Sequence, residues 1–177
     1  MKNTVKWAIC MLTTCSIIQM AFPADSTTVH ETVAPFINSR DMNRVSVDTK
    51  DLLKKGPVIL WFWNSCCGFK KPQVRMLKSL YHSYHREGLT VLAVNEDDSK
   101  KSAGITMSIK QNQLPFTIIF DNNGDIIRMF HTISVPSVYV IGQDGNLVYS
   151  QNGYIAGDEK ILEKKVNALF VNNEKDK

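Results

Sequence analysis

The sequence predicts an α/β domain in which helices cover both faces of a mixed central sheet. Three features support this: apolar strands alternate with helical patterns, a turn-linked strand pair follows, and an amphipathic helix comes last. Strands joined by helices usually pair in parallel, whereas a hairpin adds antiparallel strands to the same sheet. A chain of 177 residues has room for one such domain and a short leader.

The central strand is expected at residues 58–63, where six apolar residues follow the breaker pair Gly56–Pro57. An uninterrupted apolar run of this length indicates a strand that is buried on both faces. Before it, residues 45–47 alternate in polarity and residues 48–53 fit one helical turn. After it, apolar residues recur at helical spacing until Gly88 ends the pattern. They are Val74, Leu77, Leu80, Tyr81 and Tyr84.

The next part of the chain repeats this alternation. Residues 90–94 read as a buried strand, and residues 99–111 fit a helix with Ser99 as its expected cap. A third strand is expected at residues 117–120. Residues 125–130 fit either a strand or a short helix, because their periodicity does not separate the two.

A hairpin and a helix complete the predicted domain. Strands at residues 137–141 and 147–150 flank the turn Gln143–Asn146. Asp158 is the expected cap of the last helix, whose apolar residues lie on one face. The predicted organisation is a signal peptide or N-terminal anchor at 1–24, an extended lead-in at 25–40, a domain at 41–171 and a polar tail at 172–177.

Residues 1–24 have the three marks of a secretory signal: a positive start, an apolar core and a small residue, Ala24, at the junction. An uncleaved anchor and lipidation at Cys15 are the alternatives. We expect an exported protein, most simply a periplasmic one, that meets a membrane only through this segment if it is uncleaved. Cleavage would leave two cysteines, Cys66 and Cys67, side by side in the mature chain.

The charge pattern argues against nucleic-acid binding. The formal net charge is +4, but Lys2 and Lys6 lie in the leader, before all 17 acidic residues. The excess left in the rest of the chain is weak and scattered, whereas nucleic-acid binding needs a clustered basic surface. No zinc-ligand spacing, Gly-rich phosphate loop or Ser–His–Asp arrangement is present, so we expect no cofactor or metal.

The two adjacent cysteines lie between a predicted buried strand and a predicted helix. Free backbone N–H groups and the helix dipole at such a junction stabilise an anion. A cysteine there is favoured as thiolate, its reactive form, and Lys70 and Lys71 act in the same direction. The segment therefore predicts thiol chemistry.

Further motifs follow one another along the chain: Phe62–Trp63 before Cys67, Leu89–Asn95, Leu114–Phe116, Val135–Ile141 and Asp144–Gly145. In this order and spacing they resemble the thioredoxin superfamily, and most closely its exported TlpA/ResA-like branch. The resemblance implies a thioredoxin-like fold that exchanges thiols and disulfides with protein partners.

Carried over by position, Cys67 resembles the attacking cysteine. Pro136 resembles the cis-proline beside which an extended peptide segment of the substrate pairs. Asp98 lies near the family's buried carboxylate, which helps to move protons at the thiols. The alternatives are a plain edge-strand or turn proline at Pro136, and a solvated Asp98 in the acidic run Glu96–Asp98.

The chain departs from the family at the second cysteine, whose place is taken by Lys70, and Cys66 stands where the family has a tryptophan. Without a resolving thiol, exchange stops at the mixed disulfide until an external thiol arrives. Pro72 suggests that the following helix begins near Lys71 rather than at Gly68. A Cys66–Cys67 disulfide would strain the peptide between them, so we expect mostly free or small-thiol-capped cysteines.

Two other functions stay open at this stage. Residues 65–73 resemble the glutathione-peroxidase signature, which suggests a thiol peroxidase, although the later motifs of that family and the peroxiredoxin pattern are absent. The third interpretation is a non-catalytic thioredoxin-fold module that binds an extended segment beside Pro136.

Overall fold

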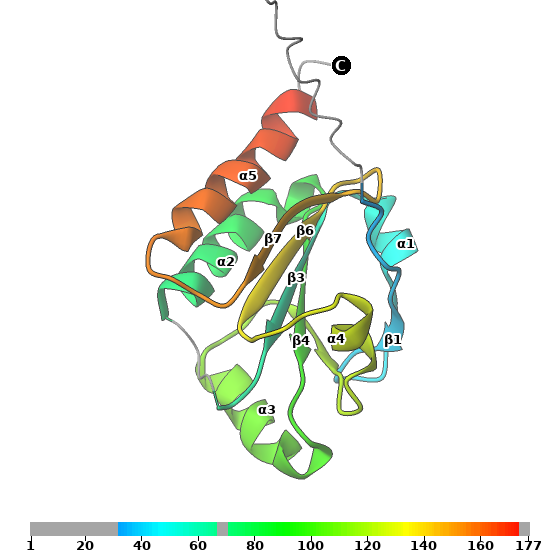
Figure 1. The fold of residues 1–177 in the computed structure, drawn as a ribbon, viewed down its shortest axis with the longest axis vertical. Helices are drawn as coiled ribbons and strands as arrows, with labels where there is room; N and C mark the ends of the chain where they lie inside the picture. Colours follow the sequence, from blue (N-terminus) through cyan, green and yellow to red (C-terminus); the bar gives the residue numbers. More distant parts are fainter. Residues whose placement is uncertain (1–31, 67–70, 174–177) are drawn as a thin grey trace, which may run out of the picture. The chain divides into compact units, whose positions relative to one another are not determined.

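The structure, a computed structural model, describes residues 32–66 and 71–173. Its main sheet has five strands in the order β5–β4–β3–β6–β7 (Figure 1). β3 pairs in parallel with β4 and β4 with β5, whereas β6 is antiparallel to both β3 and β7. The predicted mixed sheet is confirmed. Its strands are β3 (Val58–Trp63), β4 (Thr90–Asn95), β5 (Thr117–Phe120), β6 (Ser137–Ile141) and β7 (Leu147–Asn152).

β3 is the central strand, and all six of its residues are buried. Its pairing aligns Trp63 with Asn95 of β4, and Phe62 with Ser137 of β6. The carboxyl ends of β3 and β4 therefore meet the start of β6 at one edge of the sheet. In α/β sheets, ligands typically bind outside this edge.

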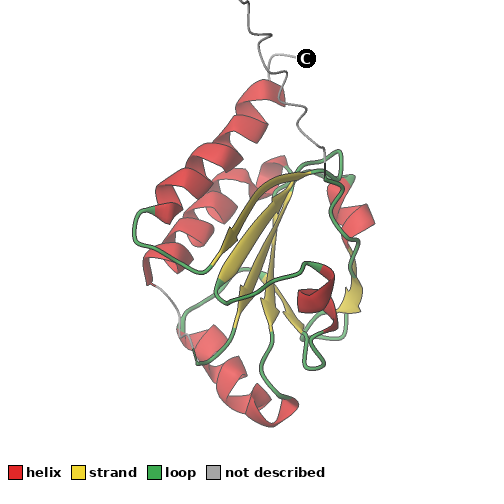
Figure 2. Ribbon diagram, viewed as in Figure 1, coloured by secondary structure: helices red, strands yellow, loops and turns green. Residues whose placement is uncertain are grey.

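Helices cover both faces of the sheet, as predicted (Figure 2). On one face, α2 (Lys71–Tyr84), α3 (Ser102–Gln111) and α5 (Asp158–Asn173) pack against a core that contains Trp61 and Trp63. On the other, α1 (Thr49–Leu53) and α4 (Asp125–Met129) enclose a core around Phe62 and Tyr139. β3 contributes to both cores because its alternate side chains point to opposite faces.

The segment before the main sheet is more structured than the sequence indicated. Ala34 and Ile37 are buried in the core, and β1 (Asn38–Arg40) pairs with β2 (Ser46–Asp48). The Ile37 N–H donates a 2.8 Å hydrogen bond to the Thr49 hydroxyl, which ties this segment to α1. The folded unit therefore includes residues 32–40, which the sequence had assigned to an extended lead-in.

Three other local predictions are resolved or corrected. Residues 125–129 form the short helix α4, not a strand. The 3-10 helix η2 (Ser99–Lys101), which leads into α3, is capped by the Asp98 carboxylate rather than by Ser99. β7 continues to Asn152, two residues beyond the predicted end.

Gly88 ends the α2 segment for a specific reason. It follows the 3-10 helix η1 (His85–Glu87) and has a φ of +105°, a conformation that only glycine adopts at little cost. A Cβ at Gly88 would collide with the carbonyl oxygen of Lys55. This close approach lets the chain turn directly into β4.

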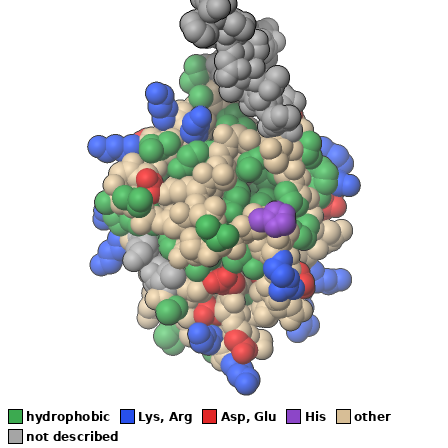
Figure 3. All heavy atoms as spheres, viewed as in Figure 1, with side chains coloured by type: hydrophobic (Ala, Val, Ile, Leu, Met, Phe, Trp, Pro, Cys, Tyr) green, Lys and Arg blue, Asp and Glu red, His purple; other side chains and the backbone are tan. Residues whose placement is uncertain are grey.

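The surface shows no concentrated basic region on the face drawn in Figure 3, where the Lys and Arg side chains are spread around the margin. Among the described helices, none has the length and apolar character needed to cross a membrane. The expected leader at residues 1–24 lies outside the described part of the chain.

Candidate active site

The turn that follows β3 carries the candidate thiol. Ser65 and Cys66 are exposed on this turn, and Cys66 is a free cysteine. Cys67 and Lys70, the predicted nucleophile and the residue in place of the second family cysteine, lie outside the described residues. The structure therefore describes the Ser65–Cys66 turn, which carries one of the two adjacent cysteines.

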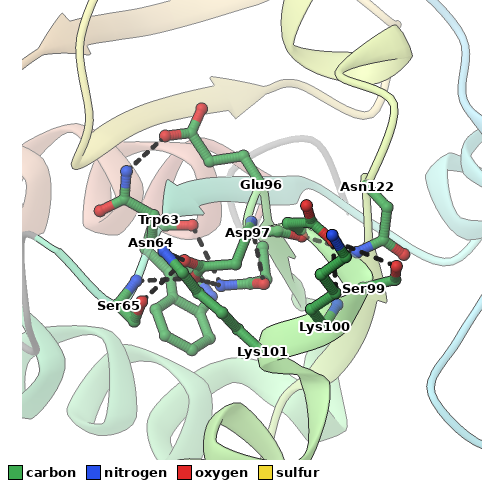
Figure 4. A network of polar contacts seen from close by, with 11 residues as sticks. Trp63, Asn64, Ser65, Glu96, Asp97, Ser99, Lys100, Lys101 and Asn122 are labelled. Carbon is green, nitrogen blue, oxygen red and sulfur yellow. Dashed lines mark hydrogen bonds and ion pairs between the residues drawn. The ribbon is translucent and has the colours of Figure 1, made fainter.

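A buried carboxylate, Asp97, holds this turn in position. Asp97 is only 5% exposed and follows β4. Its Oδ2 accepts a 2.6 Å hydrogen bond from the Ser65 N–H, and its Oδ1 accepts a 2.7 Å bond from the Ser65 hydroxyl (Figure 4). Both oxygens of one side chain thus bind the residue directly before Cys66.

Asn95, the last residue of β4, holds Asp97 in place through hydrogen bonds. Its side-chain amide donates to Asp97 Oδ2 at 3.0 Å and to the carbonyl oxygen of Trp63 at 3.3 Å. In return, the Asp97 N–H donates to Asn95 Oδ1 at 3.2 Å. Asn122, after β5, donates to the Asp97 carbonyl oxygen at 2.6 Å. The ends of three neighbouring strands are therefore joined by side-chain hydrogen bonds.

The pKa of Asp97 is lowered from its ordinary value. Burial is the largest single influence and opposes ionisation, but the hydrogen bonds together outweigh it. The donors are the Ser65 hydroxyl, the Asn95 amide, the Ser65 N–H and the Lys101 ammonium group, which lies 3.3 Å from Oδ1. Asp97 is consequently a buried anion at neutral pH.

The buried carboxylate is Asp97 and not Asp98, to which the resemblance pointed, and the alternative of a solvated Asp98 is the one that the structure shows. Asp98 is exposed, and its carboxylate accepts the Lys100 N–H at 2.9 Å as the cap of η2. Glu96 is half-buried and accepts a 2.6 Å hydrogen bond from the Asn64 amide. Asp97, the middle residue of the acidic run, is the one turned inward. The alternation Asn95–x–Asp97 at the end of a buried strand is the signal that could have indicated it.

Pro136 lies on the other side of the β3 exit. The Val135–Pro136 peptide bond is cis, as the resemblance implied, and Pro136 is buried. Because Ser137 pairs with Phe62, Pro136 lies beside the end of β3 from which the Ser65–Cys66 turn continues. The Tyr139 hydroxyl is within hydrogen-bond distance of Thr132 and Phe130, which steadies the loop that leads to Pro136.

No group of three or more His, Cys, Asp or Glu residues with the geometry of a metal site occurs within residues 32–66 and 71–173. The polar groups at the described edge of the sheet instead bind each other. What they can do chemically is to hold a cysteine-bearing turn beside an extended stretch of backbone.

Comparison with known proteins supports this description. Residues 29–150 match the AhpC/TSA family. The thiol-disulfide oxidoreductase ResA of Bacillus thuringiensis subsp. konkukian is 27% identical over 120 residues, which cover 68% of each protein. The sporulation thiol-disulfide oxidoreductase A of Bacillus subtilis is 24% identical over 102 residues, covering 57% of this chain and 62% of the relative.

Solved structures show the same fold. StoA from Bacillus subtilis superposes with a TM-score of 0.60 at 20% identity, covering 76% of this chain and 98% of StoA. The thioredoxin domain of a thiol-disulfide oxidoreductase from Bacteroides vulgatus gives a TM-score of 0.63 at 21% identity, with coverages of 77% and 96%. The chain therefore belongs to the AhpC/TSA family, and within the thioredoxin superfamily it belongs to the ResA-like branch.

Proposed function

We propose that this protein is an exported thiol-disulfide exchange protein that acts through one nucleophilic cysteine, Cys67, with Cys66 beside it. The similarity to ResA and StoA supports the class of reaction. The observation that carries the proposal is the placement of the Ser65–Cys66 turn. The buried anion Asp97 holds this turn, which continues from the end of β3 beside which the cis Val135–Pro136 bond lies.

The proposed reaction has three steps. The Cys67 thiolate attacks one sulfur of a substrate disulfide, the substrate S–S bond breaks, and the departing sulfur leaves as a thiolate that takes up a proton. Lys70 has no redox chemistry, so a thiol from solution must then attack the mixed disulfide. That attack on the protein sulfur releases the reduced substrate and leaves the external thiol bonded to Cys67. A second external thiol then attacks this new mixed disulfide, which frees Cys67 and releases the two external thiols as their disulfide.

Two exposed apolar residues suit a protein substrate, one in the loop before β6 and one in the segment after β7, whose ends Ser137 and Asn152 are paired. Ile133 is 86% exposed and Ile155 is 75% exposed. The Ile133 N–H donates to the Asn152 side chain, which places the loop before Pro136 against the end of β7. An extended substrate segment beside Pro136 would rest its own apolar side chains on these residues. Export is supported by the signal-like pattern of residues 1–24.

The nucleophile is tested by labelling the full chain with limiting iodoacetamide at neutral pH and mapping the products by mass spectrometry. We expect Cys67 to be labelled before Cys66. Cys67→Ser should abolish formation of a mixed disulfide with a model substrate, whereas Cys66→Ser should retain it. Preferential labelling of Cys66 would show that the assignment of the nucleophile is wrong.

The missing second cysteine is tested by insulin reduction with a catalytic amount of protein. The wild type should show little turnover, because each mixed disulfide waits for an outside thiol. Lys70→Cys should raise the turnover, and Lys71→Cys, with its thiol one residue further on, serves as the matched control. If one equivalent of pre-reduced wild type released fully reduced insulin chains without an added thiol, and left no mixed disulfide, the single-cysteine mechanism would be contradicted.

A second candidate function is a non-catalytic module that binds an extended segment beside Pro136. The two exposed isoleucines, Ile133 and Ile155, favour it as much as they favour catalysis. A double Cys66→Ser/Cys67→Ser variant separates the two, because a binding module would keep its partner and an exchange protein would lose its activity. Peroxide-dependent thiol oxidation would instead favour the thiol-peroxidase alternative.

A further inference from the structure

A cavity of about 480 Å³ opens beside the cysteine turn, between the end of β3 and α3. Ser65, the residue before Cys66, forms part of its wall, and the almost fully buried residues Trp63 and Ile105 also line it. Its volume lies within the range of roughly 300–1,000 Å³ that is typical of small-molecule sites. Figure 4 shows Trp63, Ser65 and Lys101 close together at this point.

The charged side chains that line the cavity are both cationic, Lys100 and Lys101. Within the described part of the chain, Lys100 makes no ion pair. The Lys101 ammonium group contacts Asp97 at 3.3 Å, the longest of that carboxylate's contacts, and it remains well exposed. Both ammonium groups therefore have N–H donors left for an anion.

The acidic residues nearby face other partners. Glu96 accepts from Asn64, Asp97 accepts from Ser65 beneath the turn, and Asp98 caps the backbone of η2. None of these three carboxylates is among the residues that line the cavity. The cavity thus offers an apolar wall and two cations next to a thiol.

Gly104 keeps this space open. It lies within α3 and lines the cavity, and a Cβ at this position would meet no heavy atom within 4 Å. Glycine inside a helix costs about 0.5–1 kcal/mol relative to alanine. A larger side chain at position 104 therefore has room to extend from α3 beside the cavity.

We propose that this cavity binds a low-molecular-weight thiol that carries a carboxylate, and that this thiol resolves the mixed disulfide. The proposal rests on the function proposed above, in which an external thiol must replace the missing second cysteine. The carboxylate would pair with Lys100 and Lys101, and the sulfur would point past Ser65 toward the cysteine turn.

The step balances with the bound thiol as reductant. Its thiolate attacks the protein sulfur of the mixed disulfide, the bond between protein and substrate sulfurs breaks, and the substrate leaves as a thiolate that takes up a proton. A second molecule of the small thiol then attacks the new mixed disulfide. This releases the small-molecule disulfide and returns the protein thiol.

The first experiment measures binding without thiol chemistry. S-methylglutathione, which carries carboxylates and cannot exchange, is titrated into the full chain while backbone amide shifts are followed by NMR. We expect saturable shifts at Ser65, Gly104 and Ser108. We expect none of them with 2-(methylthio)ethanol, a neutral thioether. If S-methylglutathione causes no saturable shift, the cavity site is overturned whether or not the protein exchanges thiols.

Two variants locate the ligand. Gly104→Leu should fill the cavity and abolish binding, with Gly104→Ala as the matched control for helix propensity. Lys100→Gln should weaken binding about two- to fivefold, the effect of one solvent-exposed ion pair. Lys164→Gln, which removes an exposed lysine of α5, should leave it unchanged. Equal binding by wild type and Gly104→Leu would overturn the proposal.

The second experiment measures resolution. A reporter mixed disulfide is formed on the full chain with Cys10→Ser and Cys15→Ser, and its release by glutathione and by 2-mercaptoethanol is followed. We expect saturation with glutathione, lost in Gly104→Leu, and linear dependence with 2-mercaptoethanol in both. Linear dependence on both thiols would overturn the proposed role while leaving the exchange function intact. Failure of the reporter to attach would count against the proposed function itself.

Discussion

Two buried aspartates follow neighbouring strands of the sheet, and they bind different parts of the molecule. Asp97 follows β4 and Asp121 follows β5, and each is 5% exposed. Asp121 accepts the backbone N–H groups of Ile126 at 3.1 Å and Ile127 at 2.8 Å. It therefore closes its own loop onto α4, five and six residues further along the chain.

Asp97 reaches across the sheet instead. Its carboxylate binds Ser65, which lies 32 residues earlier in the sequence, at the end of β3. The same residue type at the same burial thus organises a local loop in one case and the cysteine turn in the other. The comparison teaches that the role of a buried carboxylate depends on which donors the fold brings to it, because burial alone is unfavourable.

Replacing each aspartate by alanine should destabilise the protein, with the larger effect at Asp97. Asp97→Ala leaves the Ser65 N–H and hydroxyl and the Asn95 amide without their acceptor, for a loss of about 3 kcal/mol. Asp121→Ala leaves two backbone N–H groups, for a loss of about 2 kcal/mol. Urea unfolding measures both, and a larger loss at Asp121 would reverse the comparison.

The two positions should differ most clearly in thiol reactivity. The negative charge of Asp97 repels the negative charge that a nearby sulfur carries in its thiolate form, which is the form that attacks. Asp97→Asn should therefore accelerate iodoacetamide labelling of the cysteine pair about two- to fivefold at neutral pH. Asp121→Asn, the matched control, should label at the wild-type rate, and equal acceleration in both variants would remove the distinction.

The acid sensitivity of the fold should depend on Asp97. Its pKa is lowered in the folded protein, so its contribution to stability is present above the unfolded value of about 4. That contribution is lost as the pH falls through the lower, folded pKa. Asp97→Asn should flatten the decline in unfolding free energy below about pH 4, as measured by urea unfolding across a pH series. If the unfolding free energy of the variant declined with falling pH as steeply as that of the wild type, the assignment of Asp97 as the buried anion would be contradicted.

The smallest loss of stability is expected for a substitution at Lys101. This substitution tests which partner holds the Asp97 carboxylate. The ion pair is 3.3 Å long and its lysine is exposed, so Lys101→Met should cost at most about 0.5 kcal/mol. Ser65→Ala removes a 2.7 Å donor to the same oxygen and should cost about 1 kcal/mol. If Lys101→Met were the more damaging, the ammonium group rather than the turn would be the main partner of Asp97.

Much of the fold could be predicted because its signals are local. The apolar run 58–63 forms a strand buried on both faces, and the helical pattern from Val74 to Tyr84 lies within α2. Residues 32–40 were underestimated, since their burial depends on contacts such as Ile37 with Thr49, twelve residues away. No periodicity within nine residues reveals such a partner.

The candidate site likewise contains residues that the sequence could predict and residues that it could not. Cys66 and Pro136 were found from motif and position, and the structure brings them to the same edge of the sheet. Among the three adjacent acidic residues the resemblance pointed to Asp98, with a solvated Asp98 as the alternative; the structure shows Asp98 exposed and Asp97 buried. The roles predicted for Cys67 and Lys70 stay predictions, because both residues lie outside the described part of the chain.

The sequence by itself determined the α/β order, the central strand, the thiol pair after it and the family to which the chain belongs. These follow from apolar periodicity and from residue types at fixed spacing, which need no knowledge of distant contacts. The tertiary structure decided which carboxylate is buried, what holds the Ser65–Cys66 turn, and that a cavity lined by Lys100 and Lys101 opens beside it. Each of these depends on donors, acceptors and empty space supplied by segments far apart in the chain, and only folding brings those segments together.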